Sequence, residues 1–157
     1  MEYLLVKWVH IISSTILFGT GIGSAFYMFM ANRHGQVSDV YFAPRHVVFA
    51  DWVFTSPAVV IQLVTGLWLV ELAGYEYSDS WVVWALILYF FIGICWLPVV
   101  WIQLKMRDYA RDANQGNTCL PKAYWKLDKW WIILGSIAFP AVVIIFYLMV
   151  FKPDQFL

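Results

Sequence analysis

A lysine and a histidine lie three residues apart in the stretch VKWVHIISS, at the start of a long apolar run. Ionisable side chains inside a membrane span are costly and tend to mark functional sites, and neutral imidazole is a common ligand for haem iron and other metals. His10 is therefore a candidate metal ligand, and the ammonium of Lys7 suits a haem propionate. The alternative is a histidine that packs between helices and is hydrogen-bonded to a neighbour.

Further polar and small residues follow His10 at helical spacing. Lys7, His10, Ser14 and Gly21 recur at intervals of three, four and seven residues, which places them on one stripe of an α-helix. We expect this stripe to face protein and not lipid. The glycines of GTGIGSAF let another helix, or a flat ligand, approach the backbone closely.

A second polar stripe is expected on the next apolar segment. It comprises Asp51, Thr55, Ala58, Gln62 and Thr65 to Gly66, and it should also face the interior. Pro57 predicts a kink in the same segment. For Asp51, an ion pair with Arg45 is favoured over a proton relay.

An iron held by His10 raises the question of a second axial ligand. His46 is expected at the opposite membrane face, about 25 to 30 Å away in depth at 1.5 Å per residue, so the two histidines should not share one iron. The candidates are Met149, Gln62, Tyr147, Lys152, or His10 of a second subunit. The predicted cofactor-binding residues are Lys7, His10, Ser14, Gly21, Gln62 and Met149, with His10 as the metal ligand.

The elements that must position these side chains are membrane helices. Of the 157 residues, 62% are hydrophobic and only 13% are charged, which excludes an ordinary soluble domain. Four apolar stretches each reach the roughly 20 residues that a helix needs to cross a bilayer, and none alternates as barrel strands do. We predict an all-α integral membrane bundle, one domain over residues 1–157, with four transmembrane helices at about 4–31, 46–72, 81–108 and 124–151. The first is expected to be retained and not cleaved as a signal peptide.

Charge distribution predicts the orientation. The first and third loops carry Arg33, Arg45, Lys105, Arg107, Arg111, Lys122, Lys126 and Lys129, whereas the other side has only Lys7 and Lys152. Because cytoplasmic loops are rich in lysine and arginine, both termini should face outward, into the periplasm if this is a bacterial inner-membrane protein. A formal net charge of zero gives no indication of nucleic-acid binding.

Several short motifs resemble a known group of membrane proteins. They are KWVHIISS in the first helix, a Thr-Ser-Pro followed by TGLWL in the second, a tryptophan opening the third, and VFKP closing the fourth. Together they are similar to the HemJ-type protoporphyrinogen oxidases and CopD-like proteins, and closest to their uncharacterised relatives. The resemblance implies a haem b-binding protein of the inner membrane with His10 as a haem ligand. It also implies a lysine near the start of the third helix, where this chain has Ala85.

Two functions from different classes follow. The first is a haem b membrane protein with a redox or electron-transfer role, either as an oxidoreductase like the HemJ-type enzymes or as an electron carrier for a partner; the Ala85 position leaves enzymatic activity open. The second is a cofactor-free structural or assembly subunit of a larger membrane complex, supported by 20% aromatic residues and the small size of the chain. The expected partners are the lipid bilayer and either other membrane subunits or further copies of the chain. Copper transport is disfavoured, because the methionines form no cluster with His10.

Overall fold

The computed structural model describes residues 1–35 and 37–153, and over these ranges the chain is helical with no strand. The elements are α1 (Glu2–His34), α2 (Val37–Ala50), the π-helical turn η1 (Asp51–Thr55), α3 (Ser56–Leu72), α4 (Ser80–Gln115) and α5 (Lys122–Phe151). Since α2, η1 and α3 form one continuous rod, the described residues contain four helices long and apolar enough to cross a membrane. The predicted fold class is confirmed.

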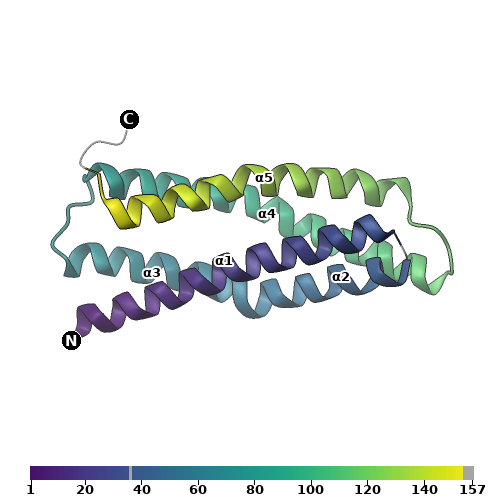
Figure 1. Cartoon of the computed structure of the whole chain (residues 1–157), viewed down its shortest axis with the longest axis horizontal. Helices are drawn as coiled ribbons and strands as arrows, with labels where there is room; N and C mark the ends of the chain where they lie inside the picture. The colour runs from purple at the N-terminus through teal and green to yellow at the C-terminus, as the bar shows by residue number, and fades with distance from the viewer. Residues whose placement is uncertain (36, 154–157) are drawn as a thin grey trace.

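The helices run side by side along the long axis of the molecule (Figure 1). The N-terminus, the end of α5 and the connection between α3 and α4 lie at one end, here called the terminal end, whereas the end of α1, the start of α2 and the α4–α5 connection lie at the other, the loop end. Helix α1 packs mainly on α2 and α3, while α4 packs on α2 and α5. The first two spans therefore meet along the contacts of α1 with α2, η1 and α3.

The second span begins earlier than the predicted residue 46. Helix α2 starts at Val37, and α1 ends at His34 with Gly35 as its C-cap in the left-handed conformation (φ 70°). Residues 37–45 resemble a loop in the sequence because Pro44 lies among them. In the structure, however, Val40, Val47 and Pro44 are fully or almost fully buried. Burial of these side chains offsets the backbone hydrogen bond that proline removes.

The irregularity expected at Pro57 takes the form of a π-helical turn. The backbone N–H of Ser56 bonds to the carbonyl of Asp51, five residues earlier, and the Ser56 hydroxyl donates to the same oxygen at 2.9 Å. Because Pro57 has no N–H, the normal ladder cannot continue through it. Such widened turns inside α-helices occur often at functional sites.

Two apolar clusters hold the ends of the bundle together. The cluster at the loop end comprises Met28, Val40, Val47, Ile102, Met106, Ala110, Tyr124 and Trp131. The cluster at the terminal end comprises Val70, Trp81, Val82, Ala85 and Leu148. Beside the first cluster, the buried Tyr124 hydroxyl donates to Asn32 Oδ1 at 2.7 Å, and Asn32 Nδ2 donates to Asp128 at 2.7 Å, which joins α1 to α5.

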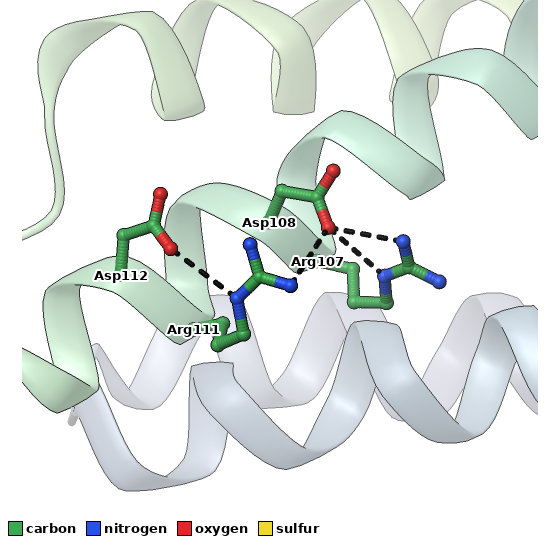
Figure 2. A network of polar contacts seen from close by, with 4 residues as sticks. All are labelled: Arg107, Asp108, Arg111 and Asp112. Carbon is green, nitrogen blue, oxygen red and sulfur yellow. Dashed lines mark hydrogen bonds and ion pairs between the residues drawn. The ribbon is translucent and has the colours of Figure 1, made fainter.

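Helix α4 is longer than a bilayer requires. Its 36 residues extend over about 54 Å at 1.5 Å per residue, whereas the hydrocarbon core is roughly 30 Å thick. Near its loop end, Arg107 and Arg111 contact Asp108, and Arg111 also bonds to Asp112 at 3.2 Å (Figure 2). These half-exposed charges indicate that this part of α4 projects beyond the hydrocarbon region.

Candidate functional site

His10 lies in the contact between α1 and α3, within a chain of hydrogen-bonded side chains. Its Nδ1 is 2.8 Å from Thr65 Oγ1, and its Nε2 is 2.8 Å from Gln62 Nε2. On the other side of Gln62, the Ser13 hydroxyl donates to Gln62 Oε1 at 2.5 Å. We call these four residues, Ser13, Gln62, His10 and Thr65, the polar seam.

The direction of each hydrogen bond in the polar seam follows from the donors available. Gln62 Oε1 accepts from Ser13, so the amide nitrogen faces the ring and donates to His10 Nε2. His10 must then carry its proton on Nδ1 and donate to Thr65 Oγ1, whose own proton goes to the Ile61 carbonyl at 2.6 Å. The arrangement assigns a neutral imidazole with its lone pair on Nε2.

Gly66 makes room for the imidazole. A Cβ atom at this position would lie 3.2 Å from His10 Cε1, closer than nine in ten real contacts of that kind. The glycine therefore allows the ring to lie directly against the α3 backbone, next to Thr65. This is a second reason, besides the hydrogen bonds, why His10 has a defined position.

The seam fits axial ligation of a haem iron in one respect and obstructs it in another. A metal-bound histidine normally donates its other N–H to a fixed acceptor, and His10 Nδ1 has that acceptor in Thr65. The Nε2 lone pair has the tautomer that iron requires, but the Gln62 amide occupies its direction. The donor set therefore fits haem only if the Gln62 side chain turns away. Over the described ranges, no group of three or more His, Cys, Asp or Glu side chains could hold a metal ion by itself.

The predicted stripe on α1 is correct for His10 and wrong for its other three members. Lys7 is exposed, with its ammonium 5.6 Å from the centre of the Tyr3 ring, and Gly21 is also exposed. Ser14 donates to the Ile11 carbonyl of its own helix at 2.8 Å. The serine that contacts α3 is Ser13, which is 3% exposed. Spacing alone did not separate the two serines, since both i+3 and i+4 neighbours lie on the same side of a helix as His10.

The predicted stripe on the second span is confirmed. Asp51, Thr55, Ala58 and Thr65 are buried, and Gln62 contacts His10 as part of the polar seam. Met149, the other predicted cofactor-binding residue, packs against the apolar cluster at the terminal end. It is not among the partners of His10.

The ion pair expected between Asp51 and Arg45 is wrong. Arg45 is exposed, while Asp51 is buried and accepts a hydrogen bond from the Thr55 hydroxyl at 2.8 Å. Because α2 begins at Val37, Arg45 lies inside a formed helix and not in a flexible first turn. Its side chain is exposed and points out of the bundle. Asp51 and Gln103 line a cavity of about 230 Å³. Sequence reasoning did not bring these two residues together, although both are polar positions in apolar segments.

Cys95 is buried in α4 and Cys119 is exposed in the following loop, and both are free thiols. A family described as "Predicted integral membrane protein (DUF2269)" matches residues 4–153. No curated protein and no solved structure matches the chain. The match extends over all four spans and over both the polar seam and the Asp51 cavity.

Proposed function

This chain belongs to the DUF2269 family of integral membrane proteins, and we propose that it binds haem b through His10 Nε2 and transfers electrons within the membrane. The observation that supports this most directly is the 2.8 Å contact between His10 Nδ1 and Thr65 Oγ1. A hydrogen bond at that nitrogen fixes the tautomer and ring orientation and makes the other nitrogen a better ligand.

Three residues prepare His10 for this role. Thr65 Oγ1 accepts the hydrogen bond from His10 Nδ1–H, and Gly66 leaves space for the imidazole ring against the α3 backbone. Gln62 donates to the Nε2 lone pair, and its side chain would have to turn away for iron to bind there. Lys7 is one helical turn nearer the terminal end, and its exposed ammonium suits a propionate carboxylate.

When bound, haem would supply one-electron redox chemistry, and the protein's part is to set the axial ligand and the polarity around it. Porphyrinogen oxidation of the HemJ type is not included in the proposal. Ala85 stands where that group has a lysine, and it is buried in the apolar cluster with Trp81 and Val82. The methyl group of Ala85 cannot hold or move a proton.

An absorption spectrum tests the proposal. The protein, purified in mild detergent from haem-sufficient cells, should show a Soret band that shifts on addition of dithionite. His10→Ala should abolish the band, whereas His46→Ala should retain it, because His46 is exposed and bonds only to the Phe42 carbonyl of its own helix. Gln62→Ala should keep or increase haem content, since it uncovers Nε2. A colourless wild-type protein would contradict the proposal.

The second candidate is a cofactor-free subunit of a larger membrane complex. The observation in its favour is that both nitrogens of His10 already have protein partners, so the polar seam is complete without a ligand. Colourless protein that copurifies with other membrane subunits would support this candidate. In that case His10→Ala would weaken the α1–α3 contact and leave no spectroscopic change.

We further propose a bacterial inner-membrane location with the loop end in the cytoplasm. The support is the concentration of lysine and arginine in the first and third loops. In this orientation the N-terminal half of α1, and with it His10, lies in the outer half of the bilayer. A haem held there would exchange electrons more readily with a partner on the outer side.

A further inference from the structure

A second polar site lies away from His10, in a cavity of about 230 Å³ between η1 and α4. Asp51 precedes Gln62 by 11 residues along the same helical rod, which is about 16 Å at 1.5 Å per residue. The cavity is therefore separate from the polar seam. Its walls include Asp51, Trp52, Trp96, Leu97 and Gln103.

One buried acceptor in this cavity has no partner. Gln103 on α4 and Asp51 on η1 both line the cavity. Gln103 Oε1 has no hydrogen-bond partner, although the residue is only 4% exposed. Buried polar atoms are almost always hydrogen-bonded, so an unpaired one indicates a ligand or water that completes the site.

The cavity also contains a carboxyl group without a basic neighbour. Within the part of the chain that the structure describes, the ion pairs join Arg107 and Arg111 to Asp108 and Asp112, and none involves Asp51. A buried carboxylate in a membrane span is normally paired with a cation or faces an aqueous cavity. Asp51 and Gln103 Oε1 thus present oxygen atoms of two side chains to the same cavity, and an ammonium group could donate to both and pair with the carboxylate.

The other residues that line the cavity indicate the size and polarity of the rest of the ligand. The indole rings of Trp52 and Trp96 are the side chains that best attract a cation. Trp52 and Leu97 are largely exposed, at 64% and 66%, so the cavity opens on the outer surface of a membrane-spanning helix pair. A ligand that enters there comes from the bilayer and must be lipophilic. Since a cavity of about 150 Å³ holds benzene, this one has space for a single aromatic ring with a short side chain.

We propose that this cavity binds a small lipophilic amine in its protonated form, with the ammonium hydrogen-bonded to Asp51 and Gln103 Oε1 and the apolar body against Trp52 and Trp96. The π-helical turn serves the site, because it widens the helix where Asp51 and Ser56 face the cavity. This proposal does not depend on haem binding at His10.

Calorimetric titration of the purified protein in neutral phosphatidylcholine nanodiscs tests it. The probes are 2-phenylethylamine, the neutral 2-phenylethanol, and ethylbenzene, which has no donor. We expect saturable binding of the amine and at least tenfold weaker binding of the other two. Asp51→Asn should weaken amine binding at least tenfold, whereas the matched control Asp112→Asn, at an exposed carboxylate on α4, should leave it unchanged.

Gln103→Leu provides an independent variant if Asp51→Asn fails to fold. It removes the unpaired oxygen and keeps an apolar side chain of similar size, so amine affinity should fall while the helical circular dichroism is retained. Equal affinity for amine and alcohol, or unchanged amine affinity in folded Gln103→Leu, would overturn the proposal. Absence of saturation with all three probes would assign the cavity to water and overturn it as well.

Discussion

His10 Nδ1 and Thr65 Oγ1 lie 2.8 Å apart across the α1–α3 contact. Thr65 also donates to the Ile61 carbonyl of its own helix, so its oxygen is held in place before it receives the imidazole proton. A fixed acceptor of this kind orients the ring whether or not a ligand binds on its other side. The consequences for stability can be measured in the protein as it stands.

Replacing Thr65 by valine should destabilise the protein, because the His10 N–H loses its acceptor while the shape of the side chain is preserved. Hydrogen bonds between membrane helices contribute about 0.6 kcal/mol on average and up to roughly 1.7 kcal/mol. The free energy of unfolding should decrease by an amount within that range. Thr65→Ser keeps the hydroxyl and serves as the control. Unfolding in mixed detergent micelles measures both. A loss in Thr65→Ser as large as in Thr65→Val would show that the methyl group, and not the hydrogen bond, matters.

The two adjacent serines of α1 should behave differently. Ser13 is buried and bonds to Gln62 on α3, whereas Ser14 bonds to the Ile11 carbonyl of its own helix. We expect Ser13→Ala to lower the free energy of unfolding by about 0.5 to 1.5 kcal/mol and Ser14→Ala to change it by less than about 0.5 kcal/mol. The same micelle assay compares them. Equal effects would argue against the placement of Ser13 in the polar seam.

Adding one methyl group at Gly66 should displace His10. The new Cβ would lie 3.2 Å from His10 Cε1, whereas at Gly93 in α4 it would meet nothing within 4 Å. Alanine is favoured over glycine in a helix interior by about 0.8 to 1.0 kcal/mol, so Gly93→Ala should be neutral or stabilising. Gly66→Ala should lose that gain and move the imidazole resonances in an NMR spectrum of ¹⁵N-histidine-labelled protein. Unmoved His10 resonances would contradict the close contact.

The helices were predictable from the sequence because apolar length is a strong signal in a membrane chain. The buried stripe of the second span was equally clear: Asp51, Thr55 and Gln62 recur at helical spacing and all face protein. The start of α2 was missed, since Pro44 normally marks the beginning of a helix and here lies fully buried inside one. Tertiary burial outweighed the local preference.

The candidate site was predicted only in part, because its contacts depend on how the helices pack. His10 and Gln62 belong to different helices, and each was identified on its own stripe, but only the packing of α1 on α3 determines that they touch. The choice of Ser13 over Ser14 depends on the rotation of α1 by a fraction of a turn. Periodicity does not determine that rotation, because the two neighbouring serines are both polar and either could face α3.

Tyr124 should be important for the stability of the loop end. Its hydroxyl is buried and donates to Asn32 Oδ1 at 2.7 Å, so Tyr124→Phe leaves that oxygen without its donor. An unsatisfied buried acceptor costs about 1 to 3 kcal/mol. Tyr27→Phe, at a residue that is 47% exposed, is the matched control and should be nearly neutral. Thermal unfolding of the two variants, followed by circular dichroism, distinguishes them, and an unaltered melting temperature in Tyr124→Phe would contradict the role of this bond.

The exposed thiol of Cys119 can test the orientation of the bundle. Cys119 lies in the connection between α4 and α5, at the loop end, whereas Cys95 is buried within α4 and should react slowly. If lysine and arginine hold the loop end in the cytoplasm, a membrane-impermeant maleimide should label Cys119 in inverted vesicles and leave it unlabelled in intact spheroplasts. Cys119→Ser, which retains Cys95, is the control for labelling elsewhere. Labelling of Cys119 from outside intact spheroplasts would reverse the orientation and move His10 to the cytoplasmic half of the bilayer, where an electron partner would have to be sought instead.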